Sequence, residues 1–218
     1  MNRLTSQLFK RFLTQYSLDT VTETLKPVPS ERYIGIDGWN ELFAFANAAS
    51  FNCGVYRVVN LEDVQFWKGA ITSVFPKFAE RIIPFGYDWL GRFFALDKGR
   101  MEQGQPLILL FSPFTNEVLE LPAGLIDFHN NILVDQSEPA VEKNLFKSFL
   151  QERKIAGIAH DVCVDLTVPL YLGGKFKIDN MNIMDVKQYW QITSAILSQI
   201  EELPVGTSIR NVALKNGN

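Results

Sequence analysis

The sequence is short of the residues and patterns that mark several protein classes. Only two of its 218 residues are cysteine and only two are histidine, which excludes a disulfide scaffold and leaves few soft ligands for a metal. Its longest apolar runs, such as residues 107–111, fall far short of the roughly 20 residues that span a bilayer. Lys10 and Arg11 interrupt the first apolar segment, unlike the core of a signal peptide. We therefore expect a cytoplasmic protein without a membrane segment.

Patterns of nucleotide binding and hydrolytic catalysis are also missing. The chain has no G-x-G-x-x-G loop, no P-loop lysine pattern and no G-x-S-x-G elbow. Residues 172–175, Leu-Gly-Gly-Lys, come nearest to a phosphate loop, and we interpret them as a turn because no helix is expected directly after them. We expect no cofactor, no bound metal and no enzymatic activity.

The charge of the chain is slightly negative and unevenly distributed. Lysine and arginine number 21 against 24 acids, so general binding to nucleic acid is not expected. Residues 101–145 carry seven acids and a single base, Lys143. This segment is either a solvated acidic face or a surface complementary to a basic partner. The acids that we consider partner-binding candidates are Asp127, Asp135, Glu138 and Glu142.

Periodicity and turn residues predict an α+β fold. An antiparallel meander is expected in the middle of the chain, because strands at 92–97, 106–112 and 117–121 are joined by short turns. Helices flank this sheet and dominate the C-terminal part. The remaining predicted strands are 54–59, 81–85 and 168–172, and the predicted helices are 4–16, a segment from Asp37 to Ala46, 61–74, 123–134, 137–153 and 185–202.

Two aromatic residues stand apart from the many that fall on predicted core faces. Tyr87 and Trp89 lie in a glycine-bounded segment, 86–91, that we interpret as a turn. Such a turn either plugs the edge of the sheet or presents an exposed aromatic anchor to a partner, a residue type enriched in binding hot spots. Tyr87 and Trp89 are therefore further partner-binding candidates.

The segment His160-Asp161-Val162-Cys163 contains the residues closest to a catalytic or metal-binding motif. A zinc site needs three or four ligands, and this spacing is not a standard finger pair. A cysteine nucleophile needs a histidine within hydrogen-bond reach, and a histidine three positions earlier would have to turn back toward it. The other histidine, His129, is interpreted as a surface residue or one with satisfied hydrogen bonds.

Several stretches resemble a known family of bacterial proteins. Residues 83–97, IPFGYDWLGRFFALD, resemble a signature of proteins with an N-terminal GAD-like domain. In the second half, 168–175 (VPLYLGGK), 178–181 (IDNM) and 185–190 (DVKQYW) resemble the domain that follows it in immunity proteins of type VI secretion, which neutralise a DNase effector. The pattern is also similar to the SUKH superfamily of immunity proteins. The resemblance covers about residues 5–205.

The resemblance implies a SUKH-like fold in two parts and a function by binding. The parts would be a GAD-like α+β domain at 1–120 and an immunity-type C-terminal domain at 121–218, which could pack as one compact unit. The expected partner is a cognate toxin, in particular a nuclease effector, whose basic cleft an acidic inhibitor can occlude. The oligomeric state is left open.

Two other classes of function are kept as alternatives. One is a regulatory or scaffold module whose basic N-terminal helix, with Lys10 and Arg11, contacts DNA. The other is a small enzyme that uses Cys163 with His160. Thiol reactivity tests the enzyme, and a steep dependence of DNA binding on salt tests the regulatory module.

Overall fold

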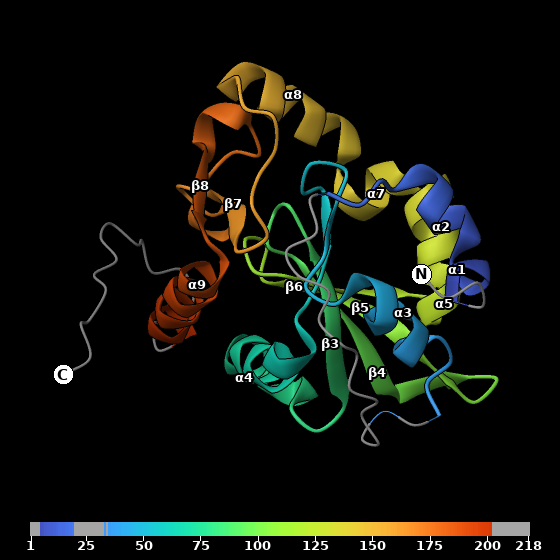
Figure 1. Ribbon diagram of the computed structural model, residues 1–218. Coiled ribbons are helices and arrows are strands. Elements are labelled where there is room, and N and C mark those ends of the chain that lie inside the picture. Colours follow the sequence, from blue (N-terminus) through green and yellow to red (C-terminus); the bar gives the residue numbers. More distant parts are fainter. Residues whose placement is uncertain (1–4, 20–32, 34, 202–218) are drawn as a thin grey trace.

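The computed structural model describes residues 5–19, 33 and 35–201 (Figure 1). Its strands are β1 (Ser50–Phe51), β2 (Tyr56–Val58), β3 (Ile82–Asp88), β4 (Phe93–Glu102), β5 (Gln105–Ser112), β6 (Glu117–Leu121), β7 (Val162–Leu166) and β8 (Met181–Asp185). Its α-helices are α1 (Thr5–Leu8), α2 (Lys10–Gln15), α3 (Trp39–Ala46), α4 (Val64–Val74), α5 (Leu125–Asp127), α6 (Leu133–Asp135), α7 (Ser137–Val141), α8 (Lys143–Arg153) and α9 (Val186–Glu201). A π-helical segment, η4 (Phe128–Ile132), joins α5 to α6. Short 3₁₀ segments are η2 (Leu61–Asp63), η3 (Pro76–Phe78), η5 (Leu170–Leu172) and η6 (Ile178–Asn180).

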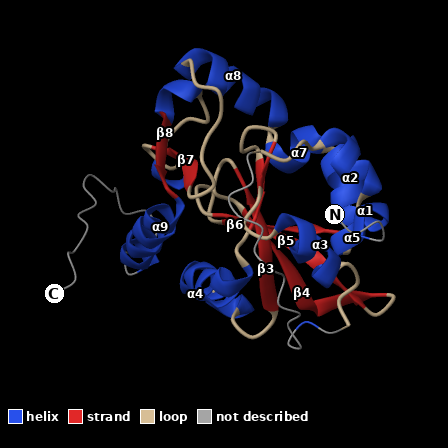
Figure 2. Ribbon diagram, viewed as in Figure 1, coloured by secondary structure: helices blue, strands red, loops and turns tan. Residues whose placement is uncertain are grey.

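The centre of the fold is a six-stranded antiparallel meander, so the predicted α+β class is confirmed. The strands lie in the order in which they occur along the chain, β1 to β6, and Figure 2 shows the helices around them. Short connections favour this order because consecutive antiparallel strands pair through tight turns. In the predicted hairpin between β5 and β6, the Thr115 hydroxyl donates to Ser112 Oγ at 2.7 Å. The strands at 92–97, 106–112 and 117–121 are confirmed, and β1 was not predicted.

Helical layers cover both faces of the sheet, and side chains of neighbouring strand residues alternate between them. Phe93 of β4 points to one layer, where its ring lies 4.5 Å from that of Trp67 in α4 and 5.5 Å from that of Trp190 in α9. Phe94 points to the other, where its ring centroid lies 4.7 Å from that of Phe128 in η4. Figure 1 shows α4 and α9 on one side of the strands and α1, α3 and α5 on the other. Because both faces are buried, strand β3 is buried along its whole length.

The N-terminal and middle helices differ in detail from the prediction. The predicted helix 4–16 is broken at Phe9, where φ is −112°, and Phe9 and Phe12 are buried while Leu8 is 38% exposed. Leu4, the first residue of that predicted helix, lies outside the described residues. A second break falls within the predicted helix 137–153, at Glu142, whose φ is +49°. Ser137, the first residue of that predicted helix, lies inside the first turn of α7.

Helix α3 begins at Trp39, two residues after Asp37, where the predicted helix begins. Gly38 is the N-cap with φ +79°, and a side chain there would bring its Cβ within 2.7 Å of Ile126 Cγ1. A glycine is therefore needed both for the backbone angle and for the approach of the helix to α5.

The C-terminal part contains a small sheet that was not predicted. β7 and β8 pair antiparallel, and α9 follows β8 directly. The predicted strand 168–172 is wrong, because residues 170–172 form a 3₁₀ turn. The Asn180 side chain accepts from Val168 N at 3.0 Å and donates to Val168 O at 2.8 Å, which uses the backbone groups that a strand ladder would need.

One contiguous core connects the two halves of the chain, from Phe9 to Leu197. The boundary at 120/121 stays a prediction. Within the described part of the chain, no helix is long and apolar enough to cross a bilayer.

Candidate partner-binding surface

Tyr87 and Trp89 are both buried, so the alternative that they form an exposed aromatic anchor is wrong. Tyr87 belongs to β3 and is 1% exposed, and Trp89 is fully buried at the start of the turn. The ring of Tyr87 stacks on that of Phe93 at 4.9 Å. Trp89 Nε1 donates to the Val141 carbonyl at 2.8 Å and its ring lies 5.2 Å from that of Phe146. Trp89 is covered by α7 and α8 of the C-terminal half, whereas Tyr87 lies under α4, with its ring 6.1 Å from that of Trp67.

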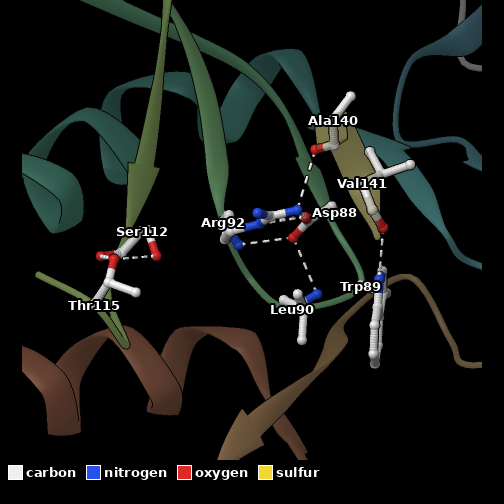
Figure 3. A network of polar contacts seen from close by, with 8 residues as sticks. All are labelled: Asp88, Trp89, Leu90, Arg92, Ser112, Thr115, Ala140 and Val141. Carbon is white, nitrogen blue, oxygen red and sulfur yellow. Dashed lines mark hydrogen bonds and ion pairs between the residues drawn. The ribbon is translucent and has the colours of Figure 1, made fainter. Parts of the chain in front are cut away.

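A buried ion pair organises the turn between β3 and β4 (Figure 3). Asp88 accepts from the backbone N–H groups of Leu90 and Arg92, each at 3.0 Å, and from Arg92 Nε at 2.6 Å. Arg92 Nη2 also donates to the Ala140 carbonyl at 3.1 Å. Burial raises the pKa of Asp88 above its ordinary value, and the Arg92 guanidinium opposes that rise. Together with the Trp89–Val141 bond, this pair ties the turn to the C-terminal end of α7.

The residues that carried the enzyme alternative do not contact one another through hydrogen bonds in the described structure. His160 Nε2 donates to the Val58 carbonyl at 2.9 Å, and the Tyr87 hydroxyl donates to the His160 carbonyl. The Cys163 thiol is fully buried, and burial raises its pKa well above the ordinary value. In the described ranges no cluster of three His, Cys, Asp or Glu side chains could hold a metal ion. This arrangement does not favour a nucleophilic thiolate.

His129 is buried with both ring nitrogens bonded, in agreement with the interpretation of a satisfied histidine. Nδ1 donates to the Leu125 carbonyl at 2.8 Å. Since that carbonyl can only accept, Nε2 is unprotonated and accepts from the Tyr56 hydroxyl at 2.9 Å. Burial lowers the pKa of His129 to about 4, so the ring is neutral at pH 7.

Three of the four acidic candidates have a partner within the chain: Asp135, Glu138 and Asp127, which accepts a hydrogen bond from Asn131 Nδ2. Asp135 is exposed but pairs with Arg11 at 2.8 Å, which also occupies one of the two bases of the proposed DNA-contacting helix. Glu138 accepts from the Asn144 backbone N–H at 2.8 Å. Glu142 is half-buried, and burial raises its pKa. Asp135, Glu138 and Glu142 lie along α6–α8 and belong to the framework more than to a free acidic face.

Asp127 is the candidate that lies at a hollow of the surface. It is exposed at the end of α5 and lines a groove of about 340 Å³. Two further carboxylates, Asp37 and Glu102, line the same groove, on the loop before α3 and at the end of β4. Nothing in the sequence connects these three acids, because they are 65 and 25 positions apart and only the fold brings them to one groove. We call this feature the acidic groove; its other lining residues are Gln103, Gln105, Leu107, Pro122, Ala123, Gly124, Leu125 and Ile126.

A second polar group lies buried in the C-terminal part. Asp165 of β7 is 8% exposed, and its Oδ1 has no hydrogen-bond partner among the described residues. Burial raises the pKa of this carboxyl to about 6. The Tyr171 and Tyr189 hydroxyls are likewise buried without a described partner. The Asp165 carboxylate therefore destabilises the fold at neutral pH, because a buried ionised carboxylate without a partner costs free energy.

The fold is thus an α+β fold in which a six-stranded antiparallel meander is covered by helices on both faces. A solved structure, that of Atu4351 from Agrobacterium tumefaciens, is similar to it with a TM-score of 0.63 over 85% of this chain and 88% of that chain. The two share 15% sequence identity, so the likeness shows a shared fold alone. No family model matches the chain. No curated protein matches it either.

Proposed function

We propose that this protein is a cytoplasmic immunity protein that binds and neutralises a cognate secreted toxin, in particular a DNase effector of type VI secretion. The observation that carries the proposal is how the stretches that resemble the immunity family lie relative to one another. Trp190, from the stretch 185–190, donates through Nε1 to the carbonyl of Gly91, in the stretch 83–97, at 3.0 Å. Gly91 also packs against Tyr189, and a Cβ there would lie 2.9 Å from its ring. The stretches 83–97 and 185–190 therefore interlock in the core.

This arrangement fits a protein that works by binding. Residues 83–97 are buried throughout, as are Val186, Tyr189 and Trp190, and they hold the framework, whereas no residue of 168–175 is buried. An exposed carboxylate surface suits a nuclease, whose substrate-binding cleft must attract phosphate and is therefore basic. Opposite charges raise the association rate, and occlusion of the cleft stops the toxin without any turnover by the inhibitor.

Co-expression with a candidate toxin tests the proposal. The C-terminal domain of the large open reading frame beside this gene is expressed in a bacterial host with this chain or with an unrelated protein of similar size. We expect growth rescue only by this chain and a one-to-one complex in size-exclusion chromatography. Loss of growth at equal soluble expression, with no complex between the purified proteins, would overturn the proposal for that toxin.

A further inference from the structure

We propose that strand β6 is a docking edge for a second copy of this chain, with the two β6 strands paired antiparallel around a two-fold axis at Leu119. β6 is the last strand of the six-stranded sheet and pairs with β5 on one side. In an antiparallel pair, the backbone groups of alternate residues point away from the partner strand. On that outer side, none of the described residues forms a backbone hydrogen bond with β6. The strand therefore presents unpaired N–H and C=O groups along an open edge.

The opposite edge of the sheet is closed, which distinguishes β6 from β1. β1 is two residues long, and an earlier segment of the chain covers it: the Asp19 N–H donates to the Ser50 carbonyl at 2.9 Å, and Leu18 forms a bridge with Phe51. Proteins commonly blunt an uncovered edge with lysine, proline or a bulge, because such an edge is a template for another strand. β6 contains neither lysine nor proline, and its register with β5 is continuous over all five residues.

The side chains of β6 are complementary to those of a second β6 in this pairing. With Leu119 on the axis, Glu117 lies opposite Leu121 of the second copy. Val118 likewise lies opposite Glu120 of the second copy. Like charges directly opposite each other destabilise a sheet, and this register brings no glutamate opposite another. The sequence of the edge therefore permits a symmetric, isologous contact.

The remaining charge and the exposed apolar surface also fit a second copy. Glu120 pairs with Arg100 of its own chain at 3.2 Å, which offsets the repulsion between the two Glu120 carboxylates, diagonal neighbours in the pair. Leu119 is 50% exposed, and in the pair it packs against Leu119 of the second copy. An interface of two five-residue strands is small, so we expect a weak dimer with a Kd of about 10–100 µM. This inference goes beyond the proposed function and does not depend on the toxin.

The test uses the full chain and two charge variants at the axis, Leu119→Lys and Leu119→Glu. Each variant alone places like charges opposite each other in a homodimer, whereas an equimolar mixture of the two places lysine opposite glutamate. The matched controls, Ile183→Lys and Ile183→Glu, change another exposed apolar strand residue, in β8. Sedimentation velocity over concentrations from well below to well above the expected Kd gives the dimer fraction. Far-UV circular dichroism checks that each variant folds.

We expect the unmodified chain and both Ile183 variants to dimerise with similar Kd. Each Leu119 variant alone should dimerise at least about 10-fold more weakly, and their mixture should return to within about 3-fold of the unmodified chain. This recovery is specific to a two-fold axis at Leu119, because only that symmetry places the residue opposite itself.

Three results would overturn the proposal. One is a monomer at every concentration, and another is a dimer that both Leu119 variants leave intact. The third is a dimer that each variant weakens but that their mixture does not restore, since the axis would then not lie at Leu119. If the unmodified chain is a monomer and both Leu119 variants lose binding to the toxin domain, the edge belongs to the toxin; the proposal then falls while the proposed function stands.

Discussion

The buried ion pair between Asp88 and Arg92 is expected to contribute far more to stability than the exposed pair between Arg11 and Asp135. The side chains of the buried pair are 0% and 8% exposed, whereas those of Asp135 and Arg11 are 52% and 53% exposed. Removing one partner of a buried pair leaves a charge without compensation and costs about 3–5 kcal/mol. An exposed pair contributes about 0–1 kcal/mol because water screens it.

Two matched double-mutant cycles measure this difference. The buried cycle uses Asp88→Asn, Arg92→Met and both together, and the exposed cycle uses Asp135→Asn, Arg11→Met and both together. Asparagine keeps an oxygen that can accept from the backbone N–H groups of Leu90 and Arg92, so the cycle isolates the charge. We expect each buried single change to cost about 3–5 kcal/mol and the coupling energy of that pair to be about 2 kcal/mol or more. In the exposed cycle the coupling should be at most about 1 kcal/mol.

Urea unfolding at pH 7.5, followed by tryptophan fluorescence and by far-UV circular dichroism, gives the free energies. Coincident transitions with the two probes establish two-state behaviour. The reasoning would be refuted by equal coupling energies in the two cycles, because burial would then not distinguish them. It would also be refuted if Asp88→Asn left the free energy of unfolding unchanged, since the core would then tolerate an Arg92 charge without a partner.

Two further predictions follow from buried titratable groups. Burial in the folded state raises the pKa of Asp165 from 3.8 to about 6. The folded protein therefore binds this proton more tightly than the unfolded chain does. We expect the free energy of unfolding to fall as the pH rises from about 4 to about 6, by at most about 3 kcal/mol. Asp165→Asn should remove this loss, so the variant should have a higher Tm than the unmodified protein at pH 7.5 and a similar Tm at pH 4. The same difference in Tm at both pH values would contradict this. For the two thiols, Cys53 is exposed and Cys163 buried, so iodoacetamide at pH 7.5 should label Cys53 in the native protein and Cys163 only after unfolding. Rapid labelling of native Cys163 would instead revive the enzyme alternative.

Local sequence was sufficient for the elements whose pattern does not depend on the rest of the fold. The predicted helix at 61–74 carries Val64, Trp67 and Ile71 at helical spacing, and these side chains are buried. The last helix was predicted in the same way. The meander was predicted because turn residues separate strands that pair with their neighbours in sequence.

The burial of individual residues needed knowledge of both layers. Residues 86–91 were interpreted as a turn because of their glycines, but β3 continues through Asp88. Nothing local shows that the end of α7 covers Trp89, because Val141 is 52 positions away. The short strands β7 and β8 were missed for a related reason: they are stabilised by each other and by α9, and an isolated two-stranded unit has little stability of its own.

The sequence by itself determined the α+β class, the antiparallel meander, two of the main helices and the negative charge of the middle segment. These properties follow from the composition and from the spacing of apolar and turn residues along the chain, because both act on neighbouring residues and need no distant contact. Only the tertiary structure decided which aromatic residues are buried, which acids are already paired, and that Asp37, Glu102 and Asp127 line one groove. Those properties depend on which distant segments pack together, and packing is decided by the whole core rather than by any single segment.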